Sequence, residues 1–247
     1  MIPMRSRRRL MLCATLLAGV AAAEATAATT VSLDGPDSRF GSPGTVYVTG
    51  GGARSHAIDV VYRSDTDSFV ITDSRRFGTL DSGCERLKRR RVRCQSPAPK
   101  GPADVTIIGG KRDDRLRVDA TVKGFSRLDG QNGDNLLRIA ARAKGGGELD
   151  GGDGRDRIFG GGGDDTISDF GGADVVRGRG GDDFVFVDLR SEDRGRNRIF
   201  TGSGGDLVLA KNGHRDELID CGPGKRDEAG LDRIDPKPRS CERVRRY

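Results

Sequence analysis

A nine-residue period of glycine and aspartate is the feature that most restricts how this chain folds. From Gly151 to Phe186 the sequence divides into four consecutive units, GGDGRDRIF, GGGGDDTIS, DFGGADVVR and GRGGDDFVF. Glycine holds the fourth place of each unit, aspartate the sixth and a branched apolar residue the eighth. These columns are Gly154, Gly163, Gly172 and Gly181; Asp156, Asp165, Asp174 and Asp183; and Ile158, Ile167, Val176 and Val185. Three columns in phase predict a stack of repeated coils.

Each column has a physical reason. A chain that turns within six residues needs positive φ angles, which glycine adopts at little cost, and the absent side chains let successive turns approach closely. The apolar residue after each turn belongs to a strand too short to be stable alone, so it must pack on its counterpart in the next coil. Stacking also brings the aspartates of neighbouring turns together, and calcium, which accepts six to eight oxygen ligands, resolves their repulsion.

The units resemble the RTX, or hemolysin-type, calcium-binding repeat, which reads GGxGxD followed by any residue, an apolar residue and any residue. The resemblance implies a parallel β-roll in which two nonapeptides form one coil. It therefore pairs Asp156 with Asp174 and Asp165 with Asp183, and implies one calcium site for each pair. Carbonyl groups around four turn glycines are the implied companion ligands: Gly152, Gly154, Gly161 and Gly163.

Departures from the repeat pattern bear on the metal. Asp169 and Phe170 replace the first two glycines of the third unit, and Arg179 replaces the second glycine of the fourth. We expect either change to disturb a calcium shell, and the neighbouring arginines to lower the local affinity for cations. The alternative is that the aspartates only cap tight turns through side-chain hydrogen bonds and bind no metal.

Weaker units extend the pattern in both directions. GGKRDDRLR starts at Gly109, GQNGDNLLR at Gly130 and TGSGGDLVL at Thr201, and each keeps part of the period. We expect the solenoid to span residues 105–220, and leave open whether the degenerate stretches 109–138 and 192–209 bind metal.

The flanks predict caps for the two ends of the solenoid. Residues 28–104 contain β-rich segments, Thr45 to Thr49, Ala57 to Tyr62 and Phe69 to Thr72, which indicate a small antiparallel unit. Residues 221–247 resemble the CGPG-containing tail of secreted proteins from GC-rich bacteria. The predicted fold is therefore all-β: a parallel β-solenoid with a small N-terminal β cap and a disulfide-bearing C-terminal cap.

The first 27 residues have the pattern of a secretory signal peptide. Four arginines precede an apolar run from Leu10 to Ala23, and small residues follow up to Ala27. The run is too short for a transmembrane helix. Cys13 lies too close to the arginines for a lipoprotein signal. We expect a secreted, extracellular protein, with cell-surface association left open.

Four cysteines follow this segment, and an even number in an exported chain indicates disulfides. The simplest pairing joins Cys84 to Cys94 and Cys221 to Cys241. A zinc site is the alternative, but neither histidine lies at a suitable spacing from the cysteines.

A run of six basic residues between Cys84 and Cys94 is the other charged feature, in a chain of formal net charge +6. Arg89, Arg90 and Arg91 at its centre are candidates for binding an anionic polymer of the cell envelope. The alternative is a solvated hairpin, because no aromatic residues are interleaved as stacking platforms for nucleic acid.

No catalytic motif is recognisable. The chain has no HExxH metalloprotease motif and no G-x-S-x-G nucleophile elbow. We therefore expect no enzyme but a calcium-binding, calcium-stabilised structural or adhesion module. The alternative function is a metal-poor extracellular scaffold that binds anionic envelope polymer through the basic segment 86–93.

Overall fold

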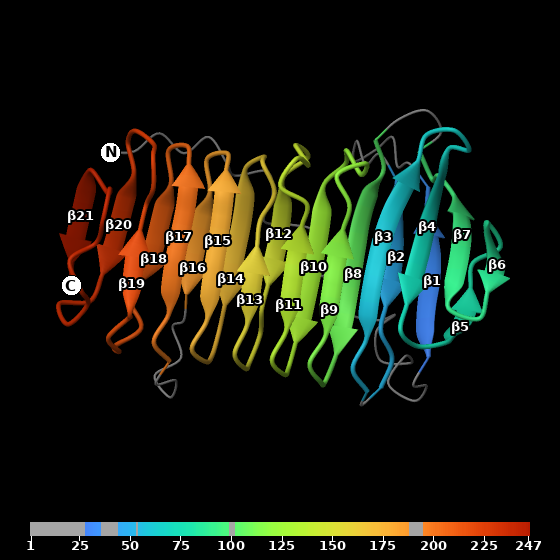
Figure 1. Ribbon diagram of the computed structural model, residues 1–247, viewed down its shortest axis with the longest axis horizontal. Coiled ribbons are helices and arrows are strands. Elements are labelled where there is room, and N and C mark those ends of the chain that lie inside the picture. The colour runs from blue at the N-terminus through green and yellow to red at the C-terminus, as the bar shows by residue number, and fades with distance from the viewer. Residues whose placement is uncertain (1–27, 36–43, 53, 99–101, 188–194) are drawn as a thin grey trace.

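The computed structural model describes residues 28–35, 44–52, 54–98, 102–187 and 195–247. The expected signal peptide, residues 1–27, lies outside the described residues. The described chain consists of β-strands and turns, with no helix among these residues. Its strands wind into an elongated β-solenoid (Figure 1). The all-β solenoid fold predicted from the nonapeptides is confirmed.

Two sheets face each other along the solenoid (Figure 1). In spatial order the first sheet contains β21 (Arg243–Arg246), β20 (Glu228–Leu231), β18 (Leu207–Ala210), β16 (Phe184–Val187), β14 (Asp165–Asp169), β12 (Gly147–Asp150), β10 (Ser126–Gln131), β8 (Asp104–Gly110), β2 (Thr45–Thr49), β1 (Thr29–Asp34) and β5 (Phe77–Leu80). The second contains β19 (Leu218–Asp220), β17 (Arg198–Ser203), β15 (Val175–Gly180), β13 (Arg157–Phe159), β11 (Leu136–Ile139), β9 (Arg115–Val118), β3 (Ala57–Arg63), β4 (Ser68–Asp73), β7 (Arg91–Gln95) and β6 (Cys84–Lys88).

The length of a coil changes along the solenoid. In the first sheet Leu149 pairs with Ile167, and Ile167 with Val185, each 18 residues on. Before this stretch, Leu128 pairs with Leu149 at a separation of 21 residues, and after it Val185 pairs with Val208 at 23. The two-nonapeptide coil is therefore confined to the regular repeats, and the coils on either side carry extra residues in their turns.

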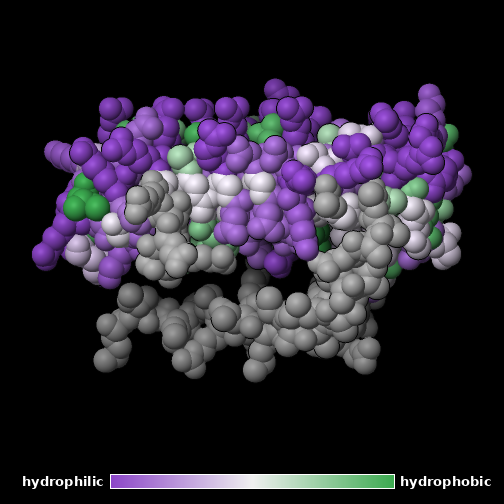
Figure 2. All heavy atoms as spheres, turned by 90° about the horizontal axis from the view of Figure 1, so that it is seen from below, coloured by the Kyte–Doolittle hydropathy of each residue, from purple (hydrophilic) through white to green (hydrophobic). Residues whose placement is uncertain are grey.

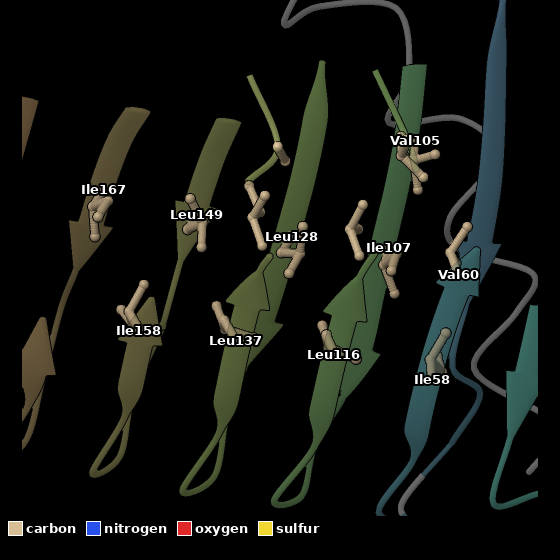
Figure 3. Packing of buried hydrophobic residues seen from close by; sticks show 14 of the residues in the cluster. Ile58, Val60, Val105, Ile107, Leu116, Leu128, Leu137, Leu149, Ile158 and Ile167 are labelled. Carbon is tan, nitrogen blue, oxygen red and sulfur yellow. The ribbon is translucent and has the colours of Figure 1, made fainter. Parts of the chain in front are cut away.

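The core is a stack of branched apolar side chains between the two sheets. Figure 3 shows Leu128, Leu149 and Ile167 of the first sheet lying across from Leu137 and Ile158 of the second. All five side chains are fully buried. Because each strand contributes only a few inward residues, no coil has a core without its neighbours.

The N-terminal strands depart from the expected boundary. The hairpin of β3 and β4 and the pairing of β6 with β7 are antiparallel, as expected for a cap. However, β2 and β3 also pair in parallel with β8 and β9, so they form a further coil of the solenoid. These strands lack the glycine and aspartate period, but they place apolar residues such as Val46 and Ile58 on the inner face, which is sufficient for stacking.

The C-terminal segment likewise continues the parallel pairing past Asp220. Strand β20 pairs with β18, and β21 pairs with β20. Disulfides join Cys84 to Cys94, within the β6–β7 pair, and Cys221 to Cys241, next to the end of β19. Both cysteine pairs match the predicted pairing. The described residues contain no helix long and apolar enough to cross a membrane.

Candidate metal centre

The four sixth-place aspartates lie in two rows of turns on opposite edges of the solenoid. We call the turns that lead into the second sheet the first row, and those that lead into the first sheet the second row. In the first row the backbone N–H of Asp156 donates to Oδ1 of Asp174 at 2.7 Å. In the second row Asp165 N–H donates to Oδ1 of Asp183 at 2.9 Å. The structure thus stacks both pairs of aspartates that the repeat pattern places together, and all four side chains are buried.

Both rows extend beyond the regular repeats as ladders of the same hydrogen bond. The first-row ladder runs through His56, Asp114, Asn135, Asp156, Asp174, Asn197, Asp216 and Asp235. The second runs through Asp165, Asp183, Asp206, Asp227 and Glu242. The nine-residue period does not reveal Asp216, Asp227 and Asp235, because inserted turn residues break it before these positions. Their signal is local: Asp216 and Asp227 each come one or two residues before a short strand.

The ladder bonds leave one oxygen of most of these carboxylates without a partner. Buried oxygens with no hydrogen-bond partner are Oδ2 of Asp156, Asp183, Asp206, Asp216 and Asp227, and Oδ1 of Asp165. Turn capping explains the bonded oxygen but not the other, because a buried polar atom without a partner costs free energy. Oxygens of this kind are suitable ligands for a hard cation such as calcium.

The raised pKa values of the aspartates in the two rows also favour a bound cation. Burial, with the charge of Asp174, raises the pKa of Asp156 from 3.8 to about 8. Burial, with the charges of Asp165 and Asp206, raises the pKa of Asp183 to about 8. Without a cation these carboxyls hold protons at neutral pH, and a bound divalent cation would stabilise the charged form instead.

A third carboxylate joins the first-row pair. Asp169, at the end of β14, points inward and is 1% exposed. Its oxygen ligand atom and those of Asp156 and Asp174 all lie within 4.8 Å of one another. Oδ1 of Asp169 is also buried without a hydrogen-bond partner. The residue expected to disturb a calcium shell therefore lies with the two aspartates as a third candidate ligand.

Glycine is required beside this cluster. A Cβ atom at Gly151 would collide with Oδ1 of Asp169 and lie 2.7 Å from Oδ2 of Asp156. Burial raises the pKa of Asp169 well above its usual value, and the adjacent carboxyl of Asp174 raises it further. The cluster of Asp156, Asp169 and Asp174, which we call the three-carboxylate centre, is thus buried and crowded with acid groups.

The second row contains a positive charge at the second place of its unit, one place beyond that of Asp169. Arg179 has a φ of 85° at the position of the replaced glycine. Its Nη1 donates to the carbonyl of Gly160 at 2.6 Å and to that of Ile139 at 2.8 Å. Burial raises the pKa of Asp165 to about 6, and backbone hydrogen bonds from Gly161 and Gly147 oppose this rise more than the charge of Arg179 does. In this row the guanidinium of Arg179 already bonds to the carbonyl oxygen of Gly160, which could otherwise coordinate a metal ion.

The predicted glycine ligands lie in the turns but are not shown to be ligands. Gly152 and Gly154 have positive φ angles of 85° and 133°, and a Cβ atom at either would collide with the preceding coil. The N–H of Gly161 donates to Oδ2 of Asp165 at 2.6 Å. A Cβ atom at Gly163 would lie 2.6 Å from the carbonyl of Lys144. Close stacking accounts for these glycines, and carbonyl coordination by Gly152, Gly154, Gly161 and Gly163 stays a prediction.

A surface groove lies beside the first row of turns. Turns of the first row lie along the lower edge in Figure 1, and Figure 2 looks onto that edge, where the described surface is mostly hydrophilic. A groove of about 660 Å³ lies there, and both acidic residues, such as Asp114 and Asp156, and basic residues, such as Arg115 and Arg157, line it.

The basic segment lies at the far N-terminal end of the solenoid. Arg89 and Arg90 are exposed in the turn between β6 and β7, while Arg91 is half-buried at the start of β7. Arg93 forms an ion pair with Glu85 at 3.1 Å. Arg89, Arg90 and Arg91 are thus remote from the carboxylate rows, and anion binding by them stays a prediction.

Comparison with known protein families agrees with this geometry. Residues 150–185 match the family described as RTX calcium-binding nonapeptide repeat, in four copies. This segment is an RTX calcium-binding repeat. Such repeats bind calcium and form structural β-solenoid modules, typically in extracellular proteins. No curated protein and no solved structure matches the chain.

Proposed function

We propose that this protein is a secreted, calcium-stabilised structural module, and that Asp156, Asp169 and Asp174 hold its principal calcium ion. The observation that carries the proposal is the set of buried carboxylate oxygens without hydrogen-bond partners. At the three-carboxylate centre, such oxygens from Asp156 and Asp169 meet in one cluster with Asp174. Carboxylates brought this close repel one another unless they are protonated or bind a cation.

Calcium suits the centre better than a smaller ion. It accepts six to eight oxygens in flexible geometry, so three carboxylates leave room for turn carbonyls and water. Carbonyls near Gly152 and Gly154 are the companions we propose on this edge. Around Asp165 and Asp183 we propose a second, weaker site, because Arg179 already bonds to the nearby carbonyl of Gly160.

Calcium binding would make folding of the solenoid depend on the compartment in which the protein is found. In the low calcium of the cytoplasm the buried carboxylates disfavour the folded coils, whereas extracellular calcium reaches the range that fills weak sites. Two disulfides also require an oxidising compartment. The expected signal peptide at residues 1–27 supports the same location. A rigid solenoid of this kind would serve at the cell surface by presenting its flat faces to a partner.

Circular dichroism of the purified protein, with and without calcium, tests the proposal. We expect millimolar calcium to increase the β-sheet signal and to raise the melting temperature by about 5–10 °C relative to chelator. Magnesium at the same concentration is the control and should have a much smaller effect, because it keeps its water ligands and demands octahedral geometry. An identical spectrum and melting temperature in chelator and in calcium would refute the proposal.

A further inference from the structure

The outer face of the second sheet carries an ordered set of arginines. Strands β9, β11, β13, β15 and β17 each present at least one outward arginine along five consecutive coils. These residues, which we call the arginine face, are Arg115, Arg117, Arg138, Arg157, Arg177 and Arg198. All six are exposed. This face is turned towards the viewer in Figure 1.

The strand register arranges these side chains into regular rows. One row reads Arg115, Leu136, Arg157, Val175 and Arg198, because these residues are register partners in successive parallel pairs. Arginine and aliphatic residues therefore alternate along the axis. Since neighbouring strands are about 4.8 Å apart, the arginines of this row recur about every 10 Å.

The arginines at the centre of the arginine face form no ion pairs among the described residues. At its two ends, Arg117 lies 3.5 Å from Asp59, and Arg198 lies 3.5 Å from Glu217. Among the described residues, the other four arginines of the face form no ion pair. They are Arg115, Arg138, Arg157 and Arg177. Four of the six arginines therefore have no direct acidic partner, although Asp113, Asp114 and Asp134 line the same groove as Arg115 and Arg157.

The opposite sheet shows that this charge belongs to one face and not to the strands in general. The outward positions of β8, β10, β12, β14, β16 and β18 include a single arginine, Arg127. It lies 3.4 Å from Glu148 on the next strand. The basic charge of the solenoid is therefore polarised towards the second sheet.

Aromatic rings hold part of the arginine face in place. The guanidinium of Arg177 lies 4.9 Å from the ring centre of Phe200, and that of Arg198 lies 5.9 Å from the same ring. Such contacts restrict the side chains before a partner arrives, so less entropy is lost on binding. They also cover the ring that would otherwise serve as a stacking platform.

We propose that the arginine face binds a linear polysaccharide that carries one carboxylate per disaccharide. The row period of about 10 Å is close to the length of a disaccharide in an extended chain. Each guanidinium pairs with a carboxylate in bidentate geometry, and the aliphatic residues between arginines lie under the neutral sugars. The strand register carries this inference, which goes beyond the proposed calcium-dependent function and does not require it.

Other anionic partners fit the face less well. A flat sheet does not enter a groove of duplex DNA. Single-stranded nucleic acid favours uncovered aromatic platforms, and Phe200 is covered by guanidinium groups. A membrane surface would favour protruding apolar side chains, whereas Leu136 and Val175 lie half-buried between the arginines.

Calorimetric titration with a hyaluronan decasaccharide tests the inference, because this oligomer carries one carboxylate per disaccharide and does not gel with calcium. We expect the triple variant Arg115→Gln, Arg157→Gln and Arg198→Gln, which removes the arginines of the row that recurs about every 10 Å, to bind about tenfold more weakly than the wild type. Lys88→Gln with Arg89→Gln and Arg90→Gln removes the same charge from the end of β6 and the β6–β7 turn, which is the other candidate anion-binding segment. This turn variant should keep its binding if the arginine face, and not the turn, holds the decasaccharide. A carboxyl-reduced decasaccharide should not bind the wild type.

Three results would overturn the inference: equal binding by the triple variant, loss of binding only in the turn variant, or tighter binding of single-stranded DNA or anionic phospholipid vesicles than of the decasaccharide. All titrations use the same millimolar calcium, and the melting temperature of each variant is measured in parallel. If calcium leaves the melting temperature unchanged while the arginine dependence holds, the proposed calcium function fails and this inference stands.

Discussion

The two rows of turns are built from the same nonapeptide but satisfy their buried aspartates differently. In the first row, the pair of Asp156 and Asp174 gains a third carboxylate from Asp169. In the second row, the pair of Asp165 and Asp183 has Arg179 nearby, bonded to the carbonyl of Gly160. The difference arises at the first two places of the unit, where the family pattern has glycine.

This comparison separates two tasks that the repeat performs together. The sixth-place aspartates hold successive turns through their backbone hydrogen bonds in both rows, with or without extra charge nearby. The first two places decide how the remaining charge is balanced. Asp169 increases the demand for a cation in the first row, whereas Arg179 reduces it in the second. A single residue change in a repeat can therefore alter its need for metal while the coil is retained.

The largest effect is expected from removing the first-row pair. Asp156→Asn with Asp174→Asn keeps an oxygen for each ladder bond but removes two of the three carboxylates. We expect loss of one calcium site by calorimetry. At calcium 100-fold above the dissociation constant of that site, the variant should also lose about 2.7 kcal/mol of calcium-dependent stability.

The matched second-row variant sharpens this result. Asp165→Asn with Asp183→Asn should cost less calcium-dependent stability, because Arg179 already supplies positive charge there. The exposed Asp113 provides a further control, since Asp113→Asn should leave the calcium stoichiometry unchanged. If the two double variants lose equal amounts of calcium-dependent stability, the rows do not differ as we argue.

The regular repeats made much of the fold and part of the site predictable. Glycine, aspartate and branched apolar residues in phase from Gly151 to Phe186 were enough to predict parallel coils and the stacking of the aspartate pairs. The period could not reveal the coils outside this stretch, because stacking needs only matching inward residues. Val46 and Val105 pair in neighbouring coils although neither follows a repeat turn.

Asp169 was beyond the reach of the repeat pattern. Its place in the unit identifies it as a departure, but only the register shows that it points inward. There it occupies the column held by Gly151 in the preceding coil, and the absent side chain of that glycine leaves the space for its carboxylate. The pairing partners of the arginine face were hidden for the same reason, since the inserted turn residues obscure which strands are neighbours.

A second, intermediate effect concerns pH in the absence of metal. Asp156 and Asp183 have pKa values of about 8 in the folded protein against an ordinary value of 3.8. A carboxyl with a raised folded pKa binds its proton more tightly in the folded state, so its contribution is complete below pH 4 and is lost as the pH rises towards 8. In chelator, urea unfolding should therefore show stability falling between about pH 4 and pH 8, and calcium should remove most of this fall.

Asp169→Asn links this pH dependence to the first row. The variant removes one buried acid from the three-carboxylate centre, so the fall in chelator should become shallower while calcium affinity drops by about tenfold. A purely structural role for Asp169 would not produce these two changes together. A pH profile in chelator identical to that of the wild type would contradict the crowding of carboxylates in this row.

The smallest expected effect is in the second row. Arg179→Gly restores the glycine of the repeat at a residue with a φ of 85°, which relieves backbone strain, but it removes the hydrogen bonds to Gly160 and Ile139. These changes oppose each other, so the stability in chelator should change by no more than about 1 kcal/mol. Calcium affinity of the Asp165 and Asp183 turns should increase, because the carbonyl of Gly160 is released and a competing cation is lost. Calorimetric titration with calcium measures this affinity. The control is Arg177→Gly, which removes the same charge from the outer face. An equal gain in both variants would show that net charge, and not the position of Arg179, sets the calcium affinity.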